Sequence, residues 1–291
     1  MTIDVKQEAF RCGRFTLPLS RPLIMGVVNI TPDSFSDGGD FLDPGRAIAH
    51  AQRLVAEGAD ILDLGGESSR PGSAPVPLEE ERRRVLPVLN EVVKLGVPVS
   101  VDTTKPELMR DVLVSGASMI NDISALGSSG AVEVIAGSDA AVCLMHMQGD
   151  PAKMQLAPFY DDVVSEVSGF LCARARCLLD SGVSASRIAI DPGFGFGKTD
   201  RHNLELLDGL PVIASQGFAV LAGLSRKSQL GRITGRTMAK SRLGASIAAA
   251  LAAVCNGASI VRVHDVAETR DALLVWQAVG AGKTENGVIS N

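Results

Sequence analysis

Two patterns of apolar and polar positions alternate along the chain, and the pair repeats eight times. In each repeat a short apolar or β-branched run ends in polar residues, and a helical stretch follows after a loop. Strands are predicted at 23–29, 60–65, 98–102, 118–122, 140–146, 187–191, 219–223 and 259–264. Helices are predicted near 43–57, 78–94, 106–115, 130–136, 162–181, 201–208, 240–256 and 265–279.

This order favours an α/β fold in which a parallel sheet closes into a (β/α)8 TIM barrel. Near-continuous apolar strands alternating with helices are typical of parallel sheets covered on both faces, and eight repeats fit the barrel. A doubly wound open sheet is the alternative, but the turn NITPDSFSDGG lacks the dinucleotide-binding glycine fingerprint. We expect one barrel domain at 21–282, an N-terminal extension or hairpin at 1–20 beneath it, and a tail at 283–291.

Composition and charge narrow the class of protein. The 291 residues are 46% hydrophobic, and the net charge of −5 gives no electrostatic footprint for nucleic acid. The N-terminus has no apolar signal segment, and the run at 245–255 is too short to span a bilayer. We therefore expect a cytoplasmic protein without a membrane partner. Five cysteines without a C-x-x-C pair predict buried free thiols.

Polar side chains gather at the predicted carboxyl ends of the strands, where barrel enzymes carry their chemistry. One aspartate in such a place is usually a helix N-cap, and Asp63 can be interpreted as that or as a packing anchor. Polar groups at six strand ends favour a site instead. They are Asn29, Asp102, Asn121, Asp122, His146, Asp191, Arg262 and His264, and Asp63 lies at a seventh strand end.

These side chains divide into two chemical groups. Asp102, Asn121 and Asp191 offer acceptors, with one amide, that suit a flat, nitrogen-rich heterocycle. The cationic or donor side chains that suit an anion are Arg70, Arg262 and His264, and Lys227 could serve either group. A substrate with a heterocycle at one end and a phosphoester at the other would use both.

Two long loops rich in Gly, Ser and Pro follow the first two strands, at 29–41 and 65–81. They are compatible with lids over a site and equally with plain surface loops. Arg70 would give the second loop a contact for phosphate or carboxylate. The acidic run 79–81 precedes the basic run 82–84 at i,i+3 spacing, which predicts a solvated, ion-paired helix face.

The stretch IDPGFGFGKT at 190–199 looks at first like a phosphate-binding loop. A Walker A motif needs glycine five positions before Gly197, but Pro192 stands there. Asp191 is the better functional candidate. Phe194 and Phe196 could cover a flat ligand or could simply pack in the core.

The metal signal is thin. The four histidines lack zinc-site spacing. A Mg²⁺ held through Asn29 and substrate phosphates fits better, because Mg²⁺ takes few protein ligands and keeps its waters.

Eight motifs together carry a family resemblance, in order from about residue 22 to 268. They are MGVVNITPDSFSDGG, DLGGESSRPG, VDTTKP, NDISA, MHMQG, DPGFGFGKT, GLSRKS and VRVHDV. In this combination the chain strongly resembles the bacterial dihydropteroate synthases, the target of sulfonamides.

The resemblance implies a (β/α)8 barrel, usually a homodimer, and a transferase of folate biosynthesis. Its reaction joins 6-hydroxymethyl-7,8-dihydropterin pyrophosphate to 4-aminobenzoate, and its small-molecule products are 7,8-dihydropteroate and pyrophosphate. Matching positions imply a pterin pocket of Asp102, Asn121, Met145, Asp191 and Lys227, and Asn29 as the Mg²⁺ ligand. They imply a pyrophosphate site of Arg70, Arg262 and His264, and an aminobenzoate site of Ser69, Arg70, Pro71, Phe196, Lys227 and Ser228.

The resemblance also implies a mechanism in which pyrophosphate leaves first and the aromatic amine attacks the resulting cation. Asp102, Lys227, Arg262 and His264 would be the catalytic residues. Two alternatives stay open. A methyltetrahydrofolate-dependent methyltransferase would share the pterin pocket but not the anion residues, and a non-catalytic paralogue would bind pterin without synthesis.

Overall fold

Eight parallel strands close into a barrel in the computed structural model, which describes residues 7–31, 44–68, 73–151 and 153–285. Neighbours around the barrel follow the order β10-β3-β4-β5-β6-β7-β8-β9. This confirms the TIM barrel, and every predicted strand agrees with the observed one to within one residue at each end. The strands are β3 (Leu23–Asn29), β4 (Ile61–Gly65), β5 (Val99–Asp102), β6 (Met119–Asp122), β7 (Ala141–Met145), β8 (Ile188–Asp191), β9 (Ala219–Ala222) and β10 (Ile260–Val263).

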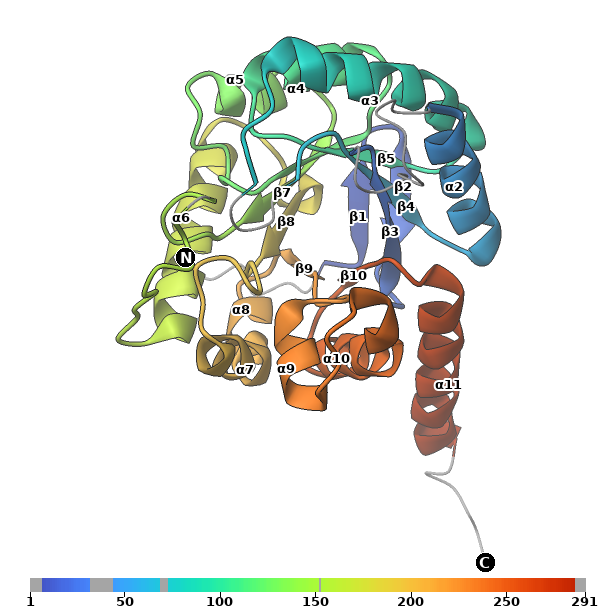
Figure 1. Cartoon of the computed structure of the whole chain (residues 1–291), viewed down its shortest axis with the longest axis vertical. Helices are drawn as coiled ribbons and strands as arrows, with labels where there is room; N and C mark the ends of the chain where they lie inside the picture. Colours follow the sequence, from blue (N-terminus) through green and yellow to red (C-terminus); the bar gives the residue numbers. More distant parts are fainter. Residues whose placement is uncertain (1–6, 32–43, 69–72, 152, 286–291) are drawn as a thin grey trace, which may run out of the picture.

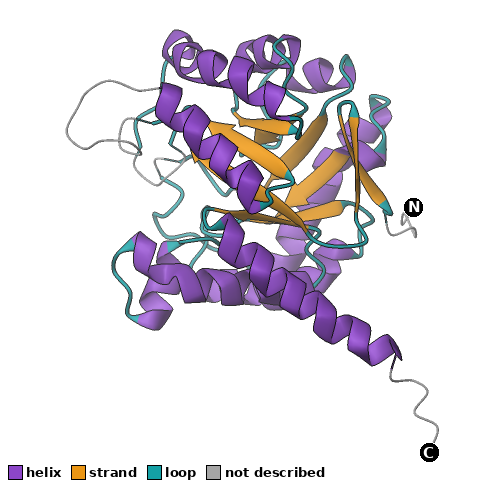
Figure 2. Cartoon of the chain, turned by 90° about the vertical axis from the view of Figure 1, so that its right-hand side faces the viewer, coloured by secondary structure: helices purple, strands orange, loops and turns teal. Residues whose placement is uncertain are grey.

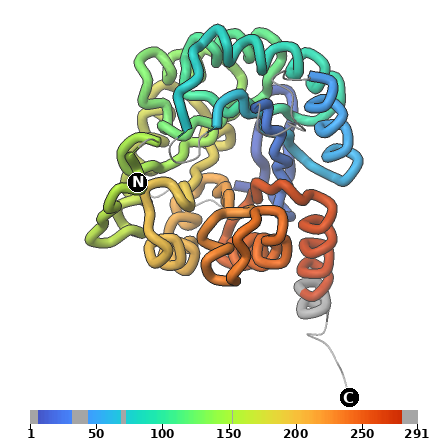
Figure 3. The backbone as a smooth tube through the Cα atoms, viewed as in Figure 1, coloured from blue at the N-terminus to red at the C-terminus, as the bar shows by residue number. Residues whose placement is uncertain are grey.

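Helices form a ring around the strands (Figures 1 and 2). The eight helices predicted between strands are present: α2 (Pro44–Glu57), α3 (Leu78–Val92), α4 (Pro106–Val114), α5 (Ala131–Ala136), α6 (Val163–Asp180), α7 (Asp200–Asp208), α10 (Leu243–Cys255) and α11 (Val266–Glu285). Short 3-10 turns η1 (Val93–Leu95), η2 (Ala185–Arg187) and η3 (Ala239–Arg242) adjoin three elements. The helix α11 runs three residues past the predicted boundary at 282, and it lies beside α2 (Figure 3).

Two short helices were not predicted, α8 (Leu210–Ala214) and α9 (Ser228–Thr234). Each has fewer than two full turns, so neither is long enough for a helical hydrophobic period to show in the sequence. The helix α9 matters for the site because it begins directly after Lys227.

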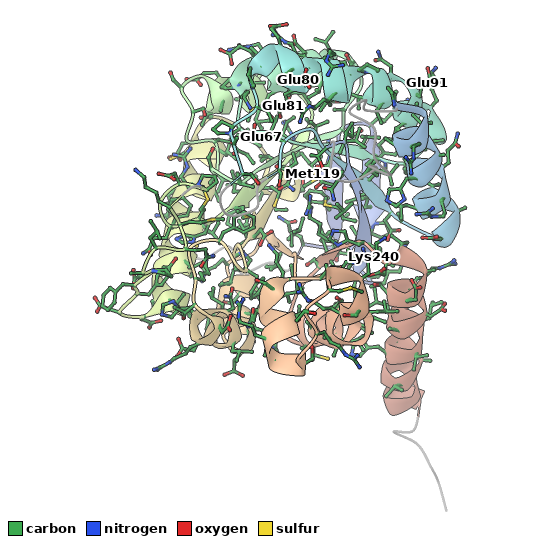
Figure 4. The ribbon with its side chains drawn as sticks, in the orientation of Figure 1. Glu67, Glu80, Glu81, Glu91, Met119 and Lys240 are labelled. Atoms are coloured by element: carbon green, nitrogen blue, oxygen red, sulfur yellow. The ribbon has the colours of Figure 1, made fainter. Side chains whose placement is uncertain are left out.

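The strands separate two apolar layers, since successive side chains point to opposite faces. Outward side chains such as Val28, Leu62 and Val101 pack against the helices in the larger cluster. Inward side chains such as Ile61 and Met119 fill the lower interior of the barrel, and Figure 4 shows Met119 near its centre.

A hairpin closes the amino-terminal end of the barrel. It consists of β1 (Ala9–Cys12) and β2 (Phe15–Pro18), which pair antiparallel, and it falls within the predicted extension at 1–20. Phe10 and Cys12 are fully buried against the inward side chains, and the Cys12 thiol donates to the carbonyl of Ser118 at 3.3 Å. The hairpin therefore acts as a plug, and the opposite end stays available for a site.

All five cysteines are free, but the prediction that they are buried is wrong for two of them, and Cys172 is only half-buried. Cys12 and Cys143 are buried, whereas Cys177 and Cys255 are exposed. Both exposed thiols lie on helices of the outer ring, on positions that do not face the strands.

A search of the described helices finds none that is by itself both long and apolar enough to cross a membrane. One bent pair, Ser228–Thr234 with Ala239–Cys255, meets the criteria of length and composition only.

Candidate active site

The strand alternation that fills the lower barrel with apolar side chains brings polar ones into its upper end. Four polar residues lie on the inward face, each on a different strand and each two residues after an apolar residue of the lower interior. They are Asp63 after Ile61, Asn121 after Met119, Asp191 after Ala189 and Arg262 after Ile260. The register places Asp102 beside Asn121, and Met145 beside Asp191. The predicted strand-end residues are thus gathered at the carboxyl end of one barrel, the end at which such barrels carry their sites.

Arg262 is held by two carboxylates. Its Nε donates to Oδ2 of Asp63 at 2.6 Å, and an NH2 nitrogen lies 3.4 Å from Oδ2 of Asp102. The amide of Asn121 also donates to Oδ2 of Asp63, at 3.3 Å. Asp63 is fully buried and its carboxylate fixes the direction of the Arg262 guanidinium. It is therefore not an N-cap, and its role goes beyond packing. The sequence indicates this inward orientation, because Asp63 stands two residues after the apolar Ile61 on the same strand.

Burial and charge shift the titration of this cluster. Burial, together with the carboxylate of Asp63, raises the pKa of Asp102, and the guanidinium of Arg262 opposes that rise. Burial alone would lower the pKa of Arg262, but Asp63 and Asp102 outweigh it and the pKa is raised. The guanidinium therefore stays charged, and Asp102 is a carboxylate that protonates at higher pH than an exposed aspartate.

Asp191 and Lys227 face the same space from β8 and from the loop after β9. The Asp191 carboxylate accepts the amide hydrogen of Gly193 at 2.7 Å, while burial raises its pKa. Burial lowers the pKa of Lys227 to about 8, although the charge of Asp191 opposes this. A negative and a positive group therefore stand together in a partly dry pocket.

Of the two phenylalanines in the loop after β8, only Phe196 belongs to the site. The Lys227 ammonium lies 4.3 Å from the centroid of its ring, a cation–π contact. Phe196 also packs with Met145 and Met154 above the apolar interior. Phe194 is buried in the outer layer instead, which is the core-packing alternative left open by the sequence.

Ser225 orients His264, and sequence reasoning missed it. The Ser225 hydroxyl oxygen accepts the His264 amide hydrogen at 3.2 Å and lies 3.0 Å from its Nδ1. Because the hydroxyl can donate to Nδ1, the contact favours the tautomer with hydrogen on Nε2. That tautomer presents a donor, as an anion site needs. A lone serine in a loop offers no sequence signal for such a role.

Asn29 is the last residue of β3 and is half-buried. It pairs with Gly65 of β4, which pairs on its other side with Asp102 of β5. A side chain at Gly65 would stand 3.9 Å from both the Asn29 amide oxygen and Asp102. A Cβ at Gly65 would thus fill the space between Asn29 and Asp102 at ordinary contact distance, and the glycine keeps that space free. Across the described ranges no three His, Cys, Asp or Glu side chains form a group that could hold a metal by themselves.

Several predicted site residues cannot be placed. Ser69, Arg70 and Pro71 lie outside the described residues, as do positions 32–41 of the first loop. Ser228 is described, and it is exposed at the start of α9 beside Lys227.

The base of the second loop is anchored by a partly buried charge cluster. The Lys105 ammonium donates to the carboxylates of both Glu67 and Glu81, and Figure 4 shows these two glutamates close together. The prediction of a solvated acidic run is wrong at Glu81, which is fully buried. Glu81 turns toward the barrel because α3 packs this face onto the sheet, while Glu80 keeps the predicted pairing with Arg83 and Arg84.

The arrangement has the chemistry of two joined subsites. One offers the buried acceptors Asp102, Asn121 and Asp191 to a heterocycle that carries N–H groups. The other offers the fixed donors Arg262 and His264 to an anion. Lys227 and Phe196 lie at the edge of the first subsite and provide a cation and a flat apolar wall.

Comparison with known proteins agrees with this chemistry. The family model of the pterin binding enzymes matches residues 25–264. A dihydropteroate synthase of Neisseria meningitidis serogroup C is 51% identical over 278 residues, which cover 94% of this chain and 98% of that protein. A Xanthomonas albilineans dihydropteroate synthase solved with 4-aminobenzoic acid has a TM-score of 0.90 at 50% identity, covering 95% of this chain and 99% of that one. A Burkholderia cenocepacia dihydropteroate synthase complexed with 7,8-dihydropteroate has a TM-score of 0.89 at 47% identity, with coverage of 97% and 99%. The chain belongs to the pterin binding enzymes and, within them, to the dihydropteroate synthase family.

Proposed function

We propose that this chain condenses 6-hydroxymethyl-7,8-dihydropterin pyrophosphate with 4-aminobenzoate, giving 7,8-dihydropteroate and pyrophosphate. The observation that carries the proposal is the contact of Arg262 with Asp63 and Asp102, because it joins the acidic and the cationic subsites on one rim. Relatives solved with 4-aminobenzoic acid and with 7,8-dihydropteroate support the same substrates.

The pterin ring would enter with its polar edge toward the buried acceptors. Asp191 accepts hydrogen bonds from N3–H and the 2-amino group, and Lys227 donates to the ring carbonyl. Asp102 and Asn121 take the remaining polar atoms, and Met145 lines a ring face. Charged acceptors in a buried pocket bind and orient such a ring strongly because they have lost competing water.

Pyrophosphate departure is the first chemical step. The C–O bond to the leaving group breaks, pyrophosphate keeps the electron pair, and the electron-rich ring stabilises the cation left behind. Arg262 and His264 donate to the departing oxygens, while the carboxylate of Asp102 stabilises the cation. A bound Mg²⁺ would add positive charge at the leaving phosphate. The residues fit it, since Asn29 offers an amide oxygen beside the space that Gly65 keeps free of a side chain, and Mg²⁺ would take its other ligands from phosphate and water.

Amine attack is the second step. The nitrogen of 4-aminobenzoate forms the new C–N bond and then loses a proton, and it needs no strong base because an aniline nitrogen is already neutral. Phe196 forms a wall for the benzoate ring, with Lys227 and Ser228 beside it. Ser69, Arg70 and Pro71 are proposed to complete this subsite from the second loop.

A coupled assay of pyrophosphate release tests the reaction. It contains the pterin pyrophosphate, 4-aminobenzoate and Mg²⁺, and it is repeated without the amine and with a chelator. We expect release that depends on both the amine and the metal ion. Folded protein that binds pterin but releases nothing would support the non-catalytic paralogue, and methyl transfer from methyltetrahydrofolate would support the methyltransferase alternative.

We also propose that the chain works as a cytoplasmic homodimer without nucleic acid. The exposed free thiols Cys177 and Cys255 fit a reducing compartment. A dimer is supported by the apolar surface of α11, where Leu274, Val275, Trp276 and Val279 are exposed.

A further inference from the structure

Lys198 is a buried lysine that the reaction does not use. Only 3% of it is exposed. It lies in the loop between β8 and α7, which begins directly after Asp191 and has Phe196 near its middle. Its ammonium lies 3.0 Å from each of the Gly193 carbonyl, the Phe196 carbonyl and the His146 Nδ1, and 3.3 Å from the His146 carbonyl. Lys198 therefore points into the protein and not toward the rim, so it is no phosphate ligand.

The loop bends around this ammonium. Gly193, Gly195 and Gly197 all have positive φ, at 68°, 80° and 62°, which lets the loop turn sharply. A turn hydrogen bond runs from the Phe196 amide to the Gly193 carbonyl at 3.1 Å. The two loop carbonyls that accept from Lys198 belong to Gly193 and Phe196, the same two residues that this hydrogen bond joins.

The loop also packs tightly on the neighbouring loop after β7. A Cβ at Gly193 would overlap the His146 carbonyl oxygen, and one at Gly197 would stand 2.6 Å from the Gln148 carbonyl oxygen. The Tyr160 hydroxyl donates to the Gly197 carbonyl at 2.8 Å. Lys198 occupies the centre of this contact and ties both loops together through His146.

The His146 ring is suited to accept from the ammonium. Burial, together with the charge of Lys198, lowers the pKa of His146 to about 3, so the ring is neutral and Nδ1 keeps its lone pair. Burial lowers the pKa of Lys198 to about 7, and the charge of Asp191 opposes this; in its charged form the group has three hydrogens for the four acceptors that converge on it. A neutral apolar side chain in this place would leave several buried carbonyl groups unpaired.

We propose that Lys198 is a positioning residue for the aminobenzoate wall: its buried ammonium holds the loop in the shape that sets Phe196 against Lys227. The inference rests on the proposed function for the identity of the second substrate. The backbone of Asp191 is held by the strand ladder, and the turn reaches its carboxylate only through the Gly193 amide, whereas the whole of Phe196 depends on the turn. Loss of the ammonium should therefore affect the second substrate more than the pterin.

Steady-state kinetics of Lys198→Met test this split. We expect the KM for 4-aminobenzoate to rise about tenfold or more, because a small misplacement of a positioned wall has a large effect. The KM for the pterin pyrophosphate should change much less, and Lys198→Arg should recover part of the loss. Lys240→Met, at an exposed lysine of η3, is the matched control and should behave as wild type (Figure 4). Equal changes in both KM values, or no recovery by arginine, would overturn the proposal.

Two further measurements keep the test decisive. Hydrogen exchange at 193–198 should be faster in Lys198→Met than in wild type, whether or not the enzyme turns over. If wild type releases no pyrophosphate, the proposed function fails, and unchanged exchange would separately overturn the role of Lys198. Should Lys198→Met not fold, His146→Gln keeps an acceptor for the ammonium and His146→Phe removes it. The second variant must then raise the KM for 4-aminobenzoate more than the first.

Discussion

Three charged side chains within the barrel depend on one another. Arg262 is the cation between Asp63 and Asp102, and each carboxylate would be costly to bury without it. The arrangement raises the pKa of Asp102, since burial and Asp63 outweigh the guanidinium. The pH dependence of the enzyme should therefore report on Asp63, which touches no substrate in the proposed mechanism.

Asp63→Asn is predicted to move the acid limb of the pH profile to lower pH. The ionised form of Asp102 is the active one, so kcat/KM rises with pH through its pKa. Removing the charge of Asp63 removes one cause of the raised pKa of Asp102, and it also frees Arg262 to interact with Asp102. Both effects lower the pKa of Asp102. Comparison of kcat/KM for the pterin pyrophosphate between pH 5 and 9 checks this. Asp180→Asn, at an exposed position, should leave the limb in place.

Asp191→Asn is predicted to weaken pterin binding without unfolding the barrel. The amide keeps the shape and one acceptor but loses the charge that receives two N–H groups, so we expect a loss of about 1.5–3 kcal/mol. Isothermal titration with the pterin pyrophosphate measures the affinity, and a melting curve measures the fold. An unchanged dissociation constant would mean that the pocket is misplaced.

At the scale of elements, the loop between β8 and α7 is the part whose shape is most constrained. Gly193 combines a φ of 68° with direct contact to the His146 carbonyl, and Gly235 has the same φ with nothing within 4 Å. Comparing these two glycines therefore separates the effect of a positive φ, which they share, from the effect of close packing, which only Gly193 has.

Gly193→Ala should destabilise the protein well beyond Gly235→Ala. The left-handed conformation costs alanine about 1 kcal/mol at both positions, whereas only Gly193 must also push two loops apart. Chemical denaturation gives the two free energies of unfolding. Equal losses would show that the loop yields at no cost and would argue against its role in holding Phe196.

The elements themselves were predictable because each strand is a short apolar run that ends in polar residues, and a longer segment with helical composition follows it. The helices α8 and α9 are too short to form such a segment. The main acceptor and donor positions of the site were predictable from strand ends, and the alternation through Ile61 also marks Asp63 as inward. Ser225, Lys198 and Glu81 were not predictable, because their roles arise from contacts with residues that are distant in sequence, namely His264, His146 and Lys105.

At the scale of the whole molecule, the helix α11 presents an apolar surface that the outer ring does not cover. On α11, Val275 and Val279 lie one turn apart and are 66% and 60% exposed. Exposed apolar side chains clustered on one helix are typical of an association surface.

Val275→Glu is predicted to convert a dimer into a monomer, because it introduces a charge into an apolar contact that has no partner for it. Val114→Glu, at a 90% exposed position on α4, is the control and should remain dimeric. Sedimentation equilibrium measures both masses. A wild-type protein that sediments as a monomer at all concentrations would reject the dimer.

The pairing of β10 with β3 also has a consequence for synthesis on the ribosome. Ile260 pairs with Leu23, so the barrel is sealed by a strand that is synthesised after its other seven strands. Until that strand emerges, Asp63 has no guanidinium beside it, and the nascent sheet keeps two open edges. An early stop before residue 260 thus yields a chain that lacks both its closing strand and its catalytic cation. Such a chain cannot act as a weak enzyme, and its open edges make it a substrate for chaperones and proteases.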